Sequence, residues 1–124
     1  MKVLVVDDEL GIQRLLKEYL ESKNCEVVLV GRGDVAFQGV MSNDFDLIFL
    51  DLKMPGWSGM EALKALDKVR KNPNIVVMSG NGVDDDVTAE LAKYDNVLDF
   101  IAKPFEINKV DSYLQVIKTY SYGG

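Results

Sequence analysis

The sequence predicts an α/β fold in which a parallel five-stranded sheet is covered by helices on both faces. Two observations lead to this prediction. Short apolar runs rich in β-branched residues recur five times along the 124 residues, and each is followed by a stretch with the spacing of an amphipathic helix. The runs are continuously apolar rather than alternating, which is typical of strands buried on both faces. Such a repeated strand–helix order favours one parallel sheet.

The five expected strands are the apolar runs themselves. They cover residues 3–6, 27–30, 46–50, 75–78 and 97–101. None approaches the roughly 18 apolar residues that a membrane span requires.

The expected helices are marked by apolar residues at helical spacing. The marking residues are, in chain order, Ile12, Leu15, Leu16, Tyr19 and Leu20; Val35, Ala36, Phe37, Val40 and Met41; Met60, Leu63, Leu66 and Val69; Val87 and Leu91; and Ile107, Val110, Leu114 and Ile117. Asn72-Pro73 ends the third helix, and the acidic residues 84–86 favour the start of the weakly marked fourth. We expect one domain at residues 1–118, with residues 119–124 as a short C-terminal tail or linker stub.

Composition excludes several classes of function. The chain has no histidine and one cysteine, which excludes Ser–His–Asp and Cys–His catalysis, His-ligated metal sites and an intrachain disulfide. The net charge of −6 argues against binding to the phosphate backbone of nucleic acids. The N-terminus has no signal-peptide pattern, so the cytoplasm is the expected location.

In parallel sheets, function collects at the carboxyl ends of the strands. Asp7 and Asp8 follow the first expected strand, Asp51 the third, Ser79 the fourth and Lys103 the fifth. If these strands are neighbours, three carboxylates, a hydroxyl and a lysine converge at one edge of the sheet.

This set of residues has the chemistry of phosphoryl transfer. Carboxylates held close together repel one another, and a hard divalent ion such as Mg²⁺ relieves the repulsion. A lysine and a hydroxyl beside the metal neutralise a transferring phosphoryl group, and Asp51 can act as the nucleophile. Each residue alone also fits an ordinary turn or cap, but their coincidence at four strand ends favours a site.

With these motifs in place, the chain resembles the receiver domains of response regulators in two-component phosphorelay signalling. The resemblance rests on VVDDE at residues 5–9, LDLKMPG at residues 50–56 and AKPF at residues 102–105, and it runs from Lys2 to about Lys118. It implies a flavodoxin-like, doubly wound sheet of five parallel strands in the order 2-1-3-4-5, with five helices.

The resemblance also implies roles for the acidic residues and the lysine. Asp51 is the expected phosphoacceptor, and Lys103 is expected to pair with the phosphoryl oxygens. The expected ligands of Mg²⁺ or Mn²⁺ are Asp7, Asp8, Asp51 and the backbone carbonyl of Lys53.

The resemblance also implies features of the residues around this site. Ser79 is expected to hydrogen-bond to the phosphoryl group and to form a conformational switch with Phe100. Pro104 is expected to follow a cis peptide bond. Lys53 and Asn81, each two residues beyond a site residue, are expected to tune the lifetime of the phosphoryl group.

The resemblance implies partners as well. A histidine kinase or a histidine phosphotransfer protein would supply the phosphoryl group, and the domain would catalyse only its own phosphorylation and dephosphorylation. The output would lie with a downstream protein target or with an effector domain absent from this chain. A phosphorylation-dependent dimer through the fourth helix, fifth strand and fifth helix is compatible with the family. Neither nucleic acid nor a membrane is an expected partner of this domain.

Three other functions stay open at this point. A flavin mononucleotide electron carrier has the same strand order, but the acidic residues 7–9 would repel its phosphate. A Mg²⁺-dependent phosphohydrolase usually carries Asp-x-Asp directly after the first strand, where this chain has Asp-Asp-Glu. A degenerate receiver that only binds proteins is disfavoured, because the acceptor, the acidic pair and the lysine are all present.

Overall fold

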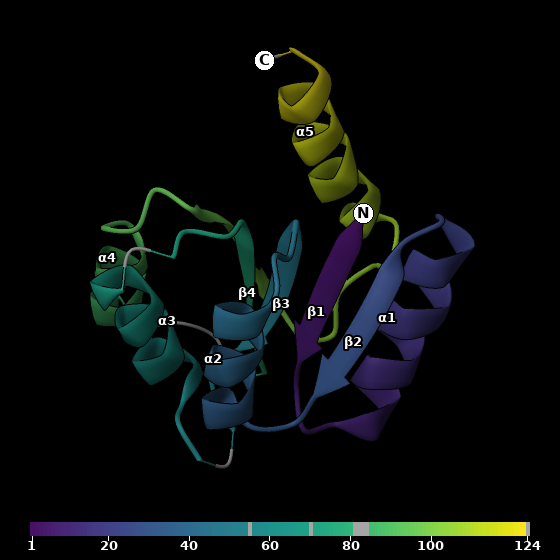
Figure 1. Cartoon of the computed structure of the whole chain (residues 1–124). Coiled ribbons are helices and arrows are strands. Elements are labelled where there is room, and N and C mark those ends of the chain that lie inside the picture. The colour runs from purple at the N-terminus through teal and green to yellow at the C-terminus, as the bar shows by residue number, and fades with distance from the viewer. Residues whose placement is uncertain (55, 70, 81–84, 124) are drawn as a thin grey trace.

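Strands and helices alternate along the chain, as the sequence predicts. The computed structural model describes residues 1–54, 56–69, 71–80 and 85–123 (Figure 1). The strands are β1 (Lys2–Val6), β2 (Glu26–Val30), β3 (Leu47–Asp51), β4 (Ile75–Ser79) and β5 (Val97–Ala102). The helices are α1 (Leu10–Ser22), α2 (Gly33–Ser42), α3 (Gly59–Lys68), α4 (Asp85–Leu91) and α5 (Lys109–Gly123).

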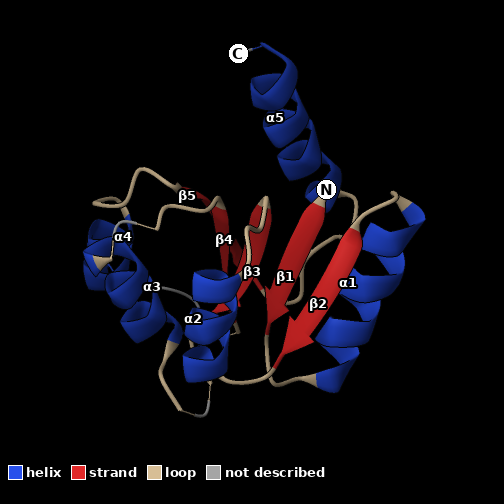
Figure 2. Cartoon of the chain, in the orientation of Figure 1, coloured by secondary structure: helices blue, strands red, loops and turns tan. Residues whose placement is uncertain are grey.

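The strands form one parallel sheet in the order β2-β1-β3-β4-β5, which confirms the expected fold class (Figure 2). From β1 the chain first moves outward to β2 and then returns past β1 to β3. The direction of winding therefore reverses between β1 and β3. In open sheets of this type, ligands bind outside the carboxyl ends of the strands at such a reversal.

Each face of the sheet packs against its own helices. Because successive residues of a strand point to opposite faces, Val3 and Val5 pack with α1 and α5, whereas Leu4 and Val6 pack with α2, α3 and α4. The buried helical residues of the two hydrophobic clusters are Leu16, Leu20, Val110, Tyr113, Leu114 and Ile117 on one face, and Ala36, Val40, Leu63, Leu66 and Leu91 on the other. Every residue of β3 and β4 is buried, which explains why both strands are apolar up to their last residues, Asp51 and Ser79.

The ends of two helices differ from the sequence-based expectation. The apolar spacing of the third expected helix runs through Val69, but α3 ends at Lys68 and Val69 is its exposed C-cap. Ile107 lies before α5, in a turn where the Val110 N–H donates to the Ile107 carbonyl, and it packs on the core from there. Residues 119–123 continue α5, and the expected domain boundary after residue 118 stays a prediction.

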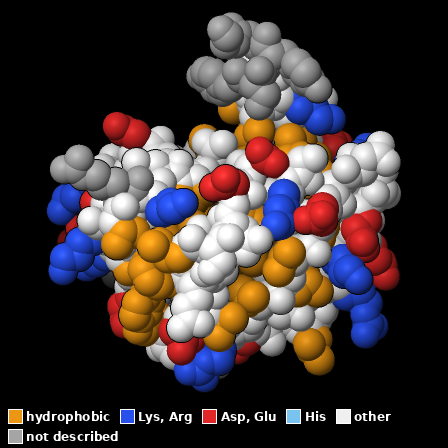
Figure 3. All heavy atoms as spheres, viewed as in Figure 1, with side chains coloured by type: hydrophobic (Ala, Val, Ile, Leu, Met, Phe, Trp, Pro, Cys, Tyr) orange, Lys and Arg blue, Asp and Glu red, His pale blue; other side chains and the backbone are white. Residues whose placement is uncertain are grey.

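The surface carries charged side chains of both signs. On the face shown in Figure 3, Lys and Arg side chains are interspersed with Asp and Glu, and hydrophobic side chains lie between them. β2 is an edge strand, and its burial is incomplete: Val28 is 37% exposed. In the described part of the chain, no helix combines the length and apolar character needed to cross a membrane.

Candidate functional site

The carboxyl ends of four neighbouring strands bring the sequence-predicted residues together. Asp51 and Ser79 are the last residues of β3 and β4, and Asp7 and Lys103 directly follow β1 and β5. Because the strands are parallel and adjacent, these four residues lie along one edge of the sheet. The backbone N–H of Lys103 donates to the Ser79 carbonyl over 2.8 Å, which ties the last two strand ends together.

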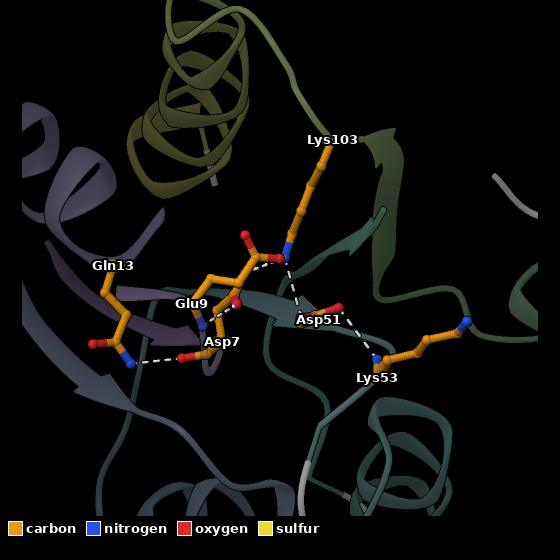
Figure 4. A network of polar contacts seen from close by, with 6 residues as sticks. All are labelled: Asp7, Glu9, Gln13, Asp51, Lys53 and Lys103. Carbon is orange, nitrogen blue, oxygen red and sulfur yellow. Dashed lines mark hydrogen bonds and ion pairs between the residues drawn. The ribbon is translucent and has the colours of Figure 1, made fainter. Parts of the chain in front are cut away.

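Lys103 lies at the centre of the polar contacts (Figure 4). Its ammonium Nζ is 2.5 Å from Asp7 Oδ2, 3.1 Å from Asp51 Oδ2 and 3.1 Å from Glu9 Oε1. Burial by itself lowers the pKa of Lys103, but the contacts with the three carboxylates outweigh burial and hold the pKa above its usual range. Lys103 is therefore charged at every physiological pH.

Asp7 is the most deeply buried of the acidic residues. Its side chain is inaccessible to solvent, whereas that of Asp51 is 6% exposed. Burial raises the pKa of Asp7; Lys103 and the Glu9 N–H oppose this shift, and the charge of Asp51 adds to it. Burial therefore disfavours the charged form of Asp7, and the nearby charge of Asp51 adds to this effect.

Backbone groups orient the two buried carboxylates. The Glu9 N–H donates to Asp7 Oδ1 over 2.8 Å, and the Lys53 N–H donates to Asp51 Oδ1 over 3.2 Å. Gln13 Nε2 donates to the Asp7 backbone carbonyl over 2.5 Å, so α1 is linked directly to the loop that follows β1. These bonds use one oxygen of each carboxylate and leave the other facing Lys103.

The residues present fit a divalent cation with oxygen ligands. One carboxylate oxygen from each of Asp7, Asp8 and Asp51 lies within 4.8 Å of the other two. Asp7 Oδ2 is buried and, despite its ion pair with Lys103, accepts no hydrogen bond from the described residues, so a ligand there would satisfy it. Carboxylate oxygens are hard ligands that suit Mg²⁺ or Mn²⁺ rather than a soft metal.

The loop after β3 is held by close backbone packing. A Cβ on Gly59 would lie 2.4 Å from the Asp51 carbonyl oxygen, so only glycine allows α3 to start this close to Asp51. The Gly59 N–H donates to the Leu52 carbonyl over 3.0 Å. Ser58 and Glu61 form a capping box that fixes the first turn of α3.

The same loop is also packed against α2. A Cβ on Gly33 would lie 2.0 Å from the Trp57 carbonyl oxygen, and the Trp57 and Phe37 rings are 5.2 Å apart. The segment that carries Lys53 is therefore supported from two helices.

The remaining expected residues are those predicted for the switch, the cis peptide bond and the tuning of the phosphoryl lifetime. Ser79 is buried at the end of β4, and Phe100 lies on β5 and packs with the hydrophobic cluster on the α2–α3–α4 face. The Lys103–Pro104 peptide bond is cis. The Lys53 side chain is exposed, and Asn81 lies outside the described residues.

Sequence reasoning missed three residues of this site. Glu9 is part of the acidic motif, but nothing in the sequence indicates its contact with Lys103, 94 residues away. Gln13 and Gly59 also received no role. For Gly59 a signal existed, because a glycine at the start of a helix, eight residues after Asp51, indicates a close approach of two backbone segments.

Comparison with known proteins gives one consistent result. Residues 3–115 match the response regulator receiver domain family. Transcriptional regulatory protein ResD of Bacillus subtilis (strain 168) is 37% identical over 109 residues, which are 88% of this chain and 44% of ResD. Sporulation initiation phosphotransferase F of the same organism is 32% identical over 109 residues, which are 88% of this chain and 86% of that protein. The chain therefore spans less than half the length of ResD.

A solved structure shows the same similarity. Response regulator protein TrrA from Thermotoga maritima, in complex with Mg(2+)-BeF, matches with a TM-score of 0.77 and 28% sequence identity. The match covers 94% of this chain and 97% of TrrA.

Proposed function

The chain belongs to the family of response regulator receiver domains, and on this basis we propose that Asp51 is the aspartate that accepts the phosphoryl group. The observation that carries the proposal is the position of Asp51. It is the last residue of β3, it is nearly buried, and its Oδ2 lies 3.1 Å from the Lys103 ammonium. The phosphoryl donor is a phosphohistidine on a histidine kinase or on a histidine phosphotransfer protein.

Asp7, Asp8, Asp51 and the backbone carbonyl of Lys53 would hold Mg²⁺. The bound ion would supply positive charge against the phosphoryl oxygens. The relative TrrA, whose structure was solved with Mg(2+)-BeF, supports this choice of ion. Mn²⁺ has the same ligand preference and is the expected substitute.

Asp51, Lys103 and Ser79 have different roles in the transfer of the phosphoryl group. A carboxylate oxygen of Asp51 attacks the phosphorus, a P–O bond forms, and the P–N bond to the donor imidazole breaks. The electron pair stays on the imidazole nitrogen, which takes up a proton. Lys103 neutralises charge on the phosphoryl oxygens, and the Ser79 hydroxyl donates a hydrogen bond to one of them. Hydrolysis of the aspartyl phosphate by water resets the domain.

The remaining roles concern the signal. Ser79 moves toward the phosphoryl group and Phe100 turns into the space that it leaves, so that the α4–β5–α5 face changes its affinity for partners or for a second copy. Lys53 and Asn81 set the lifetime of the phosphoryl group. The domain acts in the cytoplasm, binds neither nucleic acid nor a membrane itself, and turns over no separate substrate. Its output lies with a protein target or an effector domain on a longer chain.

One experiment tests the acceptor. The protein is incubated with acetyl phosphate and Mg²⁺, and intact-mass spectrometry measures the adduct. We expect one phosphoryl group that survives acid and is lost in base, and no adduct on Asp51→Asn. An adduct of equal yield on Asp51→Asn would place the acceptor elsewhere.

A further inference from the structure

Lys103 has three carboxylate partners, and only two of them belong to the group that fits a metal. Asp7 and Asp51 contact Lys103 and also lie in the acidic group with Asp8. Glu9 contacts the Lys103 ammonium at 3.1 Å but is not part of that group (Figure 4). Among these groups, the Glu9 side chain therefore contacts only the Lys103 ammonium.

The difference between Glu9 and the other two carboxylates matters when a divalent cation is bound. The Lys103 ammonium has three N–H donors, and its three contacts are with Asp7, Asp51 and Glu9. When Asp7 and Asp51 share their oxygens with a divalent cation, their attraction for the lysine falls, and like charges repel at this distance. Glu9 is then the one of the three carboxylates that is still fully available to Lys103.

We propose that Glu9 is a positioning residue, which keeps the Lys103 ammonium beside Asp51 while the other acidic residues hold the metal ion. The proposal rests on the proposed function of Asp51 and names a residue that acts through Lys103. Without this restraint, Lys103 spends less time where the phosphoryl oxygens arrive.

The local structure suits Glu9 to this role. Its backbone is fixed, because its N–H donates to Asp7 Oδ1 and its carbonyl accepts the Gln13 N–H over 3.1 Å. Its side chain is 61% exposed, whereas that of Lys103 is 7% exposed. The Glu9 carboxylate can therefore follow a small movement of the ammonium without losing burial.

The first test observes the lysine itself. Protein labelled with ¹⁵N-lysine gives an ammonium signal in the proton–nitrogen spectrum when the group is held and exchanges slowly, and Lys103→Arg assigns that signal. We expect the Lys103 signal in the wild type with and without Mg²⁺. In Glu9→Gln we expect the signal without Mg²⁺ and its loss when Mg²⁺ is added. A signal that survives Mg²⁺ in Glu9→Gln, or that is missing from Mg²⁺-loaded wild type, would overturn the proposal.

The second test measures phosphorylation by acetyl phosphate at saturating Mg²⁺. Because Glu9 is mostly exposed, we expect Glu9→Gln to lower the maximal rate by about two- to fivefold, the range for exposed ion pairs. Glu106→Gln is the matched control, since it removes an equal charge from the loop after Lys103 and should leave the rate unchanged. A Glu9→Gln deficit that is present only below saturating Mg²⁺ would show weaker metal binding instead, and would also overturn the proposal.

The two tests separate this inference from the proposed function. A wild type that takes up no phosphoryl group contradicts the role of Asp51, whereas the lysine signal still reports on Glu9. A wild type that is phosphorylated normally, with Glu9→Gln identical to it in both tests, contradicts the role of Glu9 alone.

Discussion

Replacing Lys103 with methionine removes the counter-ion of two buried carboxylates. The side chains of Lys103, Asp7 and Asp51 are exposed at only 7%, 0% and 6%. Removing one partner of a buried ion pair costs about 3–5 kcal/mol. Asp7 can take up a proton when its counter-ion is lost, because its pKa is already raised. We therefore expect the lower end of the range, a loss of about 3 kcal/mol in the free energy of unfolding at neutral pH.

The loss should depend on pH. The pKa of Asp7 lies above its ordinary value of 3.8, and without Lys103 it rises further. A carboxyl group with a raised pKa in the folded state binds more protons folded than unfolded. Its contribution to stability is therefore full below the unfolded pKa and is lost as pH rises through the folded pKa. The deficit of Lys103→Met should therefore be smaller at about pH 4 than at about pH 7.

Urea unfolding in the presence of a chelator, followed by circular dichroism, measures both effects. Lys118→Met, which removes an exposed lysine of α5, is the control and should change stability by less than about 0.5 kcal/mol. Added Mg²⁺ should restore part of the stability of Lys103→Met, because a ligand that binds only the folded state stabilises it. A deficit below about 1 kcal/mol at neutral pH, or an equal deficit at both pH values, would refute the reasoning.

Two further variants test the packing of α3 against the site and the contact between α5 and β5. Gly59→Ala should cost about 1–3 kcal/mol and slow phosphorylation, because the new Cβ would lie 2.4 Å from the Asp51 carbonyl oxygen. Urea unfolding and the acetyl phosphate assay check this against Gly39→Ala, whose Cβ has nothing within 4 Å; equal behaviour of the two variants would contradict it. Tyr113→Phe should cost about 1 kcal/mol, because it loses the 2.6 Å hydrogen bond to Asp99. Burial and Asp99 raise the pKa of Tyr113, so the wild type should lose stability as pH rises above the ordinary tyrosine value of 10, and Tyr113→Phe should lose less. Melting temperatures at about pH 8 and pH 11 compare the two proteins, and equal losses would argue against the raised pKa.

The fold was accessible to sequence reasoning because the sheet is parallel and central. Strands buried on both faces are mainly apolar, so β3 and β4 are visible as apolar runs that break only at their last residues. Helix ends were less accessible, because local contacts decide them. Val69 continues the apolar spacing of α3, but it lies beyond the last helical turn.

The site was accessible for a related reason. Asp7, Asp51 and Lys103 stand directly at strand ends, and parallel topology alone brings such positions together. The contact of Glu9 with Lys103 depends instead on the path of two loops and on side-chain reach, for which the sequence has no periodic signal. The supporting role of Gly59 depends on how closely α3 approaches Asp51, and this distance is likewise fixed only by tertiary packing.

The position of β5 as the last strand along the chain has a consequence for biosynthesis. β5 is the last strand of the sheet in the chain, and Lys103 follows it directly, whereas Asp7 and Asp51 belong to strands made much earlier. A nascent chain that has emerged from the ribosome only through β4 holds both carboxylates without their ammonium partner. The site can therefore assemble only after nearly the whole domain has been translated, and a prematurely terminated fragment lacks the charge that the buried carboxylates require.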